Sequence, residues 1–270
     1  MTTHQLWQSG MRGTRRPLLS KLPEVTAYFW ITKVLTTGMG ETTSDFLAHT
    51  LNPAIAVGLG GLGLIAALAG QLAARRYVAW IYWTAVVMVS VVGTMAADVL
   101  HVGLGVPYLV STPFFAAALA VILVLWYRSE GTLSIHSIRT RRREIYYWAT
   151  VLATFALGTA AGDLTAMPIG LGYLGSGVMF AGVFAIPGLA YWKLGMNPIL
   201  AFWFAYIVTR PLGASFADWM AVSHARGGLA LGLWQTSLAW ALLIVAFVTY
   251  LACSRTDVER PHPQPTSEEP

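Results

Sequence analysis

Hydrophobic residues in the chain gather into eight long blocks that are separated by short polar breaks. A helix needs roughly 20 mainly apolar residues to cross the hydrocarbon core of a bilayer, and every block is long enough. The glycines and prolines inside several blocks are tolerated in membrane helices. The pattern predicts an all-α fold, a polytopic membrane bundle of eight transmembrane helices. The expected spans are about 24–48, 53–74, 77–100, 106–127, 145–167, 169–192, 197–221 and 228–252.

The odd-numbered blocks repeat one sequence pattern four times. An aromatic residue precedes a tryptophan, a glycine follows ten residues after the tryptophan, and an aspartate follows fifteen residues after it. The members are Trp30, Trp83, Trp148 and Trp203, then Gly40, Gly93, Gly158 and Gly213, then Asp45, Asp98, Asp163 and Asp218. Each unit contains two blocks, so we expect four parallel two-helix repeats that cross the bilayer in the same direction. Their expected bounds are about 21–75, 76–128, 145–193 and 196–252, within one membrane domain over 21–252.

The distribution of Lys and Arg predicts the orientation. The segments on the side of the N-terminus hold fourteen of these residues, whereas the opposite side holds only Arg226. Because cytoplasmic loops carry the excess of Lys and Arg, we expect a multi-pass protein of the bacterial cytoplasmic (inner) membrane with both termini in the cytoplasm. A tail over 1–20, a basic loop over 129–144 and a disordered tail over 253–270 are the predicted cytoplasmic segments.

Composition narrows the class of protein further. Hydrophobic residues make up 56% of the 270 positions and charged residues 11%, against about 25% charged in soluble domains. The single cysteine, Cys253, excludes disulfide scaffolds and multi-cysteine metal sites. The net charge of +5 does not indicate a nucleic-acid partner, because the basic residues lie in the loops of a membrane protein. The chain has no nucleophile motif and no phosphate-binding loop, so we expect neither enzyme activity nor a bound cofactor.

The stretch KLPEVTAYFWITKVLTTGMGETTSDF at 21–46 and the fourfold tryptophan pattern carry a resemblance. The chain resembles a family of uncharacterised bacterial integral-membrane proteins built from four tandem two-helix repeats, each with a characteristic tryptophan. The resemblance covers about residues 21–252. It implies the architecture of eight spans and no particular activity.

The candidate chemistry lies on the helical face of each repeated aspartate. Positions four apart share a face, so Lys33, Thr37 and Glu41 lie on the face of Asp45, and Arg210 lies on that of Asp218. Ionisable groups within a bilayer face a cavity, a partner or a pathway. If the four faces meet in the interior, five carboxylates oppose two bases, and the surplus must be protonated in part or bind cations. We expect a cation or proton site formed by Glu41, Asp45, Asp98, Asp163 and Asp218, with Lys33 and Arg210 tuning its charge.

Structural interpretations of these residues stay open. The aspartates could form a ring that packs the repeats, and the pairs Lys33–Glu41 and Arg210–Asp218 could be ion pairs along single helices. The four tryptophans are expected at the cytoplasmic interface as an aromatic belt, with an intracellular gate as the alternative.

Three histidines follow the aspartates closely, at His49, His101 and His224. Histidine with carboxylate can bind first-row metals, so these three are candidate metal ligands. Interfacial positions or loop hydrogen bonds are the alternative. The expected function is a transporter or exporter of a small cation, such as a divalent metal (manganese, for example), with the lipid bilayer and a cation or proton as partners. The alternatives are a non-transporting scaffold or sensor and, less favoured, a haem-binding redox membrane protein; the oligomeric state is left open.

Overall fold

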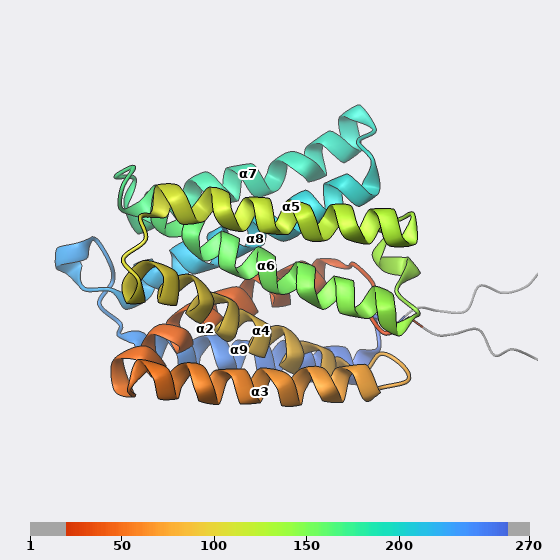
Figure 1. Ribbon diagram of the computed structural model, residues 1–270, viewed down its shortest axis with the longest axis horizontal. Helices are drawn as coiled ribbons and strands as arrows, with labels where there is room; N and C mark the ends of the chain where they lie inside the picture. The colour runs from red at the N-terminus through yellow and green to blue at the C-terminus, as the bar shows by residue number, and fades with distance from the viewer. Residues whose placement is uncertain (1–19, 259–270) are drawn as a thin grey trace, which may run out of the picture.

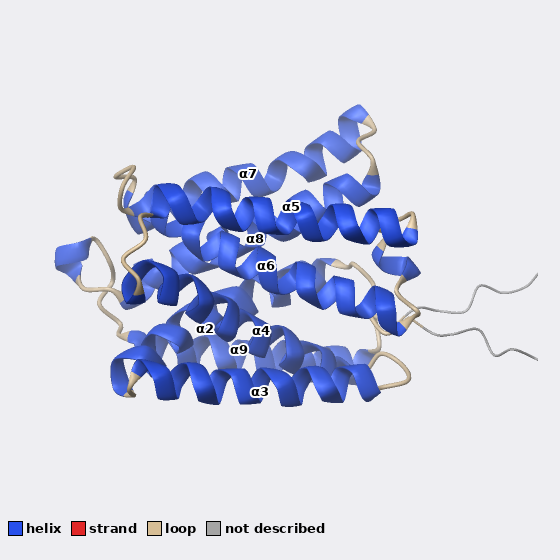
Figure 2. Cartoon of the chain, viewed as in Figure 1, coloured by secondary structure: helices blue, strands red, loops and turns tan. Residues whose placement is uncertain are grey.

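The computed structural model describes residues 20–258. These residues form eight long α-helices with short connections and contain no β-strand (Figure 2). The helices are α2 (Ala27–Thr50), α3 (Pro53–Ala73), α4 (Ala79–Asp98), α5 (Tyr108–Glu130), α6 (Arg141–Ala166), α7 (Gly172–Leu194), α8 (Pro198–Ala221) and α9 (Leu233–Ser254). The all-α fold is confirmed, and each helix overlaps one of the expected spans.

The helix ends follow from local sequence signals. Thr26 accepts a hydrogen bond from the backbone N–H of Phe29 and so caps α2. Asn52 and Asn197 cap α3 and α8 in the same way, and each precedes a proline at the first helical position. Gly131 ends α5 in the left-handed conformation, which favours glycine.

Seven helices, α3 to α9, are long and apolar enough to cross a membrane. The outer helices expose large apolar side chains such as Leu62 and Ile65, which suits contact with lipid rather than water. The helix α2 is set apart by Lys33, Glu41 and Asp45, which interrupt its apolar sequence. Length and composition alone therefore support seven of the eight expected membrane spans.

The eight helices form two concentric layers. The inner helices make a closed ring in which α2 contacts α4, α4 contacts α6, α6 contacts α8, and α8 contacts α2. Each outer helix packs mainly on the inner helix of the following unit: α3 on α4, α5 on α6, and α7 on α8. The inner ring closes through the contact between α8 and α2, and the last outer helix, α9, packs on α2. In Figure 1 the blue helix α9 lies beside α2 although they are the last and first helices.

The repeated glycines explain how the inner helices approach so closely. A Cβ atom on Gly40 would lie 1.7 Å from Ser90 Oγ, and one on Gly158 would lie 2.1 Å from Arg210 Cγ. All four glycines meet the same position of the next unit, eight residues before its aspartate: Thr37, Ser90, Phe155 and Arg210. The four units are therefore related by an approximate fourfold rotation, and small residues at the contacts permit it.

Two predicted segment boundaries are wrong. The basic loop expected over 129–144 is shorter, because α5 continues to Glu130 and α6 begins at Arg141, where the capping side chain of Thr140 starts the helix. The tail expected from residue 253 is ordered up to residue 258, because Asp257 is buried and accepts a hydrogen bond from the Tyr77 hydroxyl at 2.5 Å. Residues 1–19 and 259–270 lie outside the described residues.

Candidate functional site

A cavity of about 590 Å³ lies between the C-terminal ends of the inner helices. All four repeated aspartates line it, together with Glu41. The sequence prediction that these side chains converge is therefore confirmed as a matter of position. The approximate fourfold symmetry is the cause, because it carries equivalent residues of the four units to the same level around one axis.

The five carboxylates differ in burial and in hydrogen bonding. Asp45, Asp98 and Asp163 are half-buried, and Ser44 Oγ donates to Asp98 Oδ2 at 3.3 Å. Glu41 and Asp218 are 4% and 7% exposed. Within residues 20–258, no side chain donates a hydrogen bond to the Asp218 carboxylate or forms an ion pair with it.

The floor of the cavity is built around one guanidinium group, that of Arg210 in α8. Its Nη2 donates to Glu41 Oε2 in α2 at 2.8 Å and to Thr159 Oγ1 in α6 at 2.8 Å, and it also contacts Thr94 Oγ1 in α4. Its Nη1 donates to the Thr37 carbonyl at 2.9 Å. One side chain thus links its own helix to the other three inner helices, and the planar fork of arginine suits this task.

The ion pairs considered along single helices are wrong. Glu41 of α2 pairs instead with Arg210 of the neighbouring inner helix α8, and among the described residues neither Lys33–Glu41 nor Arg210–Asp218 forms an ion pair. The long side chain of Arg210, in the last inner helix, extends toward the centre of the ring and meets Glu41 from the first inner helix there. This pair neutralises Glu41, so the remaining charge of the cavity comes from the four aspartates.

Arg226 is the only Lys or Arg among the described residues that lines the cavity. It lies in the loop before α9, and its Nη2 donates to the hydroxyl group of Tyr173. Four aspartates therefore face one guanidinium group. In a low-dielectric setting such an excess must be relieved by protonation or by bound cations.

Lys33 lies in α2 on the N-terminal side of Glu41, is fully buried, and does not line the cavity. Its Nζ lies 3.9 Å from the centroid of the Phe155 ring and 4.4 Å from that of Tyr206. Among the residues that the structure describes, it has no hydrogen-bond partner. Its ammonium group is therefore held by ring faces, which attract cations.

The three candidate histidines are dispersed. His49 lines the rim of the cavity, but its Nδ1 bonds the carbonyl oxygen of Asp45 at 2.7 Å. His101 is buried against Tyr108 and bonds Ser111 Oγ, while His224 Nδ1 bonds the Gly228 carbonyl at 2.9 Å. Within the described part of the chain, no three His, Cys, Asp or Glu side chains form a group that could hold a metal ion.

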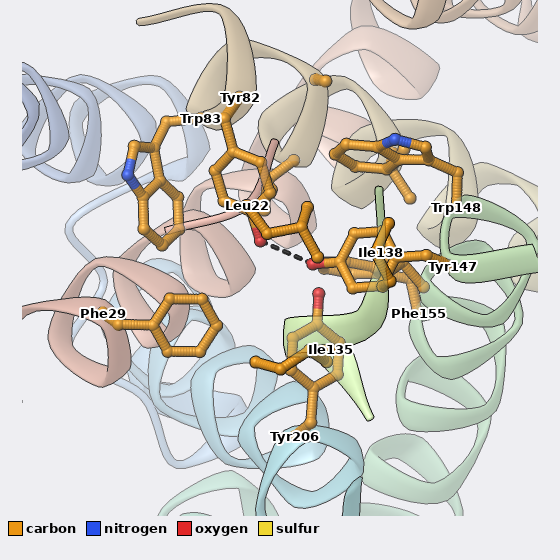
Figure 3. Packing of buried hydrophobic residues seen from close by; sticks show 14 of the residues in the cluster. Leu22, Phe29, Tyr82, Trp83, Ile135, Ile138, Tyr147, Trp148, Phe155 and Tyr206 are labelled. Atoms are coloured by element: carbon orange, nitrogen blue, oxygen red, sulfur yellow. Dashed lines mark hydrogen bonds between the residues drawn. The ribbon is translucent and has the colours of Figure 1, made fainter. Parts of the chain in front are cut away.

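The opposite ends of the inner helices are filled by aromatic side chains (Figure 3). The hydroxyls of Tyr82 and Tyr147 form a hydrogen bond of 2.5 Å, and Figure 3 shows the Tyr206 hydroxyl directed toward this pair. Leu22, from the segment before α2, and Ile138, from the connection between α5 and α6, are buried in the same cluster. This end of the ring is closed by packed side chains.

The aromatic belt predicted for the tryptophans is wrong for three of the four. Trp83, Trp148 and Trp203 are buried in this closed end, and Trp30 is half-buried. The Trp203 Nε1 donates to the Leu133 carbonyl at 2.9 Å. The loops and the segment before α2 fold over the helix ends, and this cover buries tryptophans that would otherwise lie at the membrane interface.

Among the cavity residues that the sequence interpretation missed are Tyr108, Tyr173 and Arg226. A signal for the tyrosines was present, because each lies ten residues after its aspartate, Asp98 or Asp163. Arg226 was visible as the single Lys or Arg on its side of the chain, eight residues after Asp218, but the sequence did not indicate that its loop brings it to the cavity.

The comparisons with known proteins identify the repeats. A family model described as a Repeat of Unknown Function (DUF347) matches residues 28–77, 81–132, 146–196 and 201–257. The four matches cover more than half of the chain, and each spans most of one inner helix and the outer helix that follows it. Comparison with curated proteins and with solved structures gave no match.

Proposed function

Because the chain belongs to the DUF347 repeat family, whose function is unknown, we propose from the cavity itself that the protein transports a small cation across a membrane. The observation that carries the proposal is the cavity that four equivalent aspartates line, with Arg226 as the only Lys or Arg among the described residues that line it. Carboxylates that face a cavity inside a membrane bundle are typical of a binding place for charged cargo. The excess of carboxylates makes that cargo positive.

The proposal includes α2 as an eighth transmembrane helix. Its polar residues contact other inner helices: Glu41 binds Arg210 of α8, and Ser44 binds Asp98 of α4. Polar groups that are satisfied inside the bundle do not have to face lipid. Eight spans with the excess of Lys and Arg at the closed end give cytoplasmic termini and a cavity toward the outside. In this view the protein is a transporter of the bacterial cytoplasmic membrane and catalyses no covalent chemistry.

The proposed transport cycle rests on the cavity at one end of the inner helices and the packed aromatic cluster at the other. Cations are attracted to the aspartates, and the Arg210–Glu41 pair and the aromatic cluster block their further passage. Transport therefore requires a second state in which the closed end opens and the cavity closes, as alternating access demands. Protonation of the aspartates would release the cargo, so proton counterflow is the proposed coupling.

The test is flux through purified protein in proteoliposomes. A proton gradient should drive cation movement, and an internal pH dye measures the proton flux that accompanies it. Asp218→Asn should reduce the rate of this flux about tenfold or more, since a charged hydrogen-bonding group is worth about 1.5–3 kcal/mol. Glu24→Gln is the matched control, because Glu24 is a carboxylate outside the cavity. Full flux in Asp218→Asn, Asp98→Asn and Asp163→Asn would exclude these residues from the mechanism.

A non-transporting scaffold or sensor is the second candidate. The Ser44–Asp98 hydrogen bond favours it, because it joins α2 to α4 as a packing contact would. For a scaffold, Ser44→Ala should lower the thermal midpoint because it removes the donor, Asp98→Asn should lower it less because its amide oxygen can still accept from Ser44, and neither variant should show a cation effect. Stabilisation by a cation that is lost in Asp98→Asn but kept in Ser44→Ala would count against the scaffold.

A further inference from the structure

We infer that the cargo of this cavity is an organic ammonium ion that carries an apolar group, rather than an inorganic ion. The inference rests on the proposed function and deepens it by naming the class of cation. Three features of the cavity carry it: its volume, its apolar and aromatic walls, and one buried carboxylate without a donor.

The volume of the cavity matches an organic molecule. At about 590 Å³ it lies within the range of roughly 300–1,000 Å³ that is typical of small-molecule pockets. A water molecule occupies about 30 Å³ of liquid, so the space corresponds to about 20 waters. An inorganic cation with its first hydration shell would leave most of this space to further water.

The walls of the cavity are largely apolar. They are formed by side chains such as Val57, Met95, Val102, Met167 and Val222. Such walls give a hydrated inorganic ion no favourable contact. An alkyl or aryl group gains about 25 cal/mol for each Å² of apolar surface that it buries against them.

Two aromatic rings add to this selectivity. Tyr108 and Tyr173 start the outer helices α5 and α7 and both line the cavity. The Arg226 guanidinium already lies 5.5 Å from the centroid of the Tyr173 ring, and the Tyr108 ring packs on His101 with 4.2 Å between centroids, so the remaining surface of each ring is what a ligand can contact. Aromatic ring surfaces attract ammonium groups and recur in the recognition of alkylated ammonium ions. The same rings also pack against apolar parts of a ligand, so they serve both halves of an amphiphilic cation.

Asp218 provides the anchor for the charged end. It lines the cavity, is 7% exposed, and accepts no side-chain hydrogen bond within residues 20–258. Its carboxylate opens into the cavity, where an ammonium group could donate a charge-assisted N–H···O bond to it. The half-buried Asp163 and Asp98 lie at the same level of the ring and provide further acceptors for a second N–H.

The positions of the carboxylates fit an ammonium ion better than a metal ion. A divalent metal draws its ligands into one shell at 2.0–2.6 Å from a single point. Here the carboxylates come from four helices around a wide cavity, and in the described part of the chain no three of them group in a way that would hold a metal. An ammonium group needs one or two acceptors, and the remainder of the ligand fills the cavity.

The experiment is isothermal titration calorimetry on the full chain in lipid nanodiscs at neutral pH, with four probes. The probes are 2-phenylethylammonium chloride, ammonium chloride, 2-phenylethanol and manganese chloride. The first has both charge and an apolar group, the second charge only, and the third an apolar group only. We expect saturable binding of 2-phenylethylammonium that is about tenfold or more tighter than that of the other three probes.

Variants separate the two halves of the site. Asp218→Asn should weaken binding of 2-phenylethylammonium about tenfold or more, because it removes the charge that the ammonium group needs. Tyr108→Ala should weaken it, and Tyr108→Phe, which keeps the ring, should restore it. Glu24→Gln, at the other end of the protein, should bind as the wild type does. If Mn²⁺ binds more tightly than 2-phenylethylammonium, or if 2-phenylethanol binds equally well, the inference is overturned.

The outcomes distinguish this inference from the proposed function. Asp218-dependent binding of 2-phenylethylammonium without flux in proteoliposomes would uphold the ligand class and overturn transport. Aspartate-dependent flux of a metal ion without binding of 2-phenylethylammonium would uphold transport and overturn the ligand class.

Discussion

Replacement of Arg210 by methionine tests the floor of the cavity most directly. Methionine fills much of the same space but removes every hydrogen bond that the guanidinium group makes to Glu41, Thr159 and the Thr37 carbonyl. The Glu41 carboxylate then stays buried at 4% exposure, with only the hydroxyls of Thr94 and Thr159 near it at 3.2 and 3.3 Å.

The magnitude follows from the burial of the pair. Arg210 is fully buried, and breaking a buried ion pair by removing one partner costs about 3–5 kcal/mol. For a chain of this size, each kcal/mol shifts the thermal midpoint by roughly 2–4 °C, so Arg210→Met should lower it by roughly 6–20 °C. Arg210→Lys keeps the charge but loses the fork, so its midpoint should lie between those of Arg210→Met and the wild type.

The assay is thermal unfolding in detergent of Arg210→Met, Glu41→Gln and the double variant. Most of the loss in Arg210→Met comes from the unpaired Glu41 carboxylate, so Glu41→Gln should recover part of it in the double variant. The two losses should therefore be clearly non-additive. Additive losses, or an Arg210→Met protein as stable as the wild type, would refute the claim that this pair joins the inner helices.

Three further predictions concern other parts of the ring. Gly158→Ala should lower stability by about 1–3 kcal/mol, because its Cβ would lie 2.1 Å from Arg210 Cγ, whereas Gly61→Ala, with no atom within 4 Å, should be unaffected in the same thermal assay. Tyr82→Phe should cost about 1–2 kcal/mol, because it leaves the buried Tyr147 hydroxyl without its partner, and the double variant with Tyr147→Phe should recover part of that loss. Burial raises the pKa of Asp257, so the folded state binds this proton more tightly than the unfolded chain, and its contribution to stability is lost as the pH rises from about 3.9 through the raised pKa. Asp257→Asn should remove this component from a plot of thermal midpoint against pH; an unchanged plot would contradict the assignment.

The architecture was predictable because two periodicities coincide in the sequence. Blocks of about 20 apolar residues gave the helices, and the repeated glycine and aspartate gave the face that each inner helix turns to the axis. The convergence of Asp45, Asp98, Asp163 and Asp218 follows from these two facts together. The glycine repeat also indicated close helix packing, although not which residue of the next unit each glycine would meet.

The contacts within the site were less predictable, because they join distant segments. The shared helical face of Lys33 and Glu41, two steps of four residues apart, indicated that they pair, but Glu41 binds Arg210, 169 positions away. The burial of Trp83, Trp148 and Trp203 depends on Leu22 and Ile138, whose segments fold over the helix ends. A single sequence shows the period of a helix but not the path of the loops that cover it.

The closed circle of α2 to α9 makes the covalent order of the units almost arbitrary. The backbone N–H of Glu24 bonds the carbonyl oxygen of Asp257 at 2.9 Å, so a short linker could join these two ends and a cut elsewhere could replace them. Four separate copies of one two-helix unit could in principle assemble into the same ring as a cyclic homotetramer. A homotetramer, however, would crowd four arginines around the axis. Fusion of the units into one chain allows a single Arg210 to meet a single Glu41 there. The centre of the ring is therefore asymmetric, although the four units around it are related by approximate fourfold symmetry.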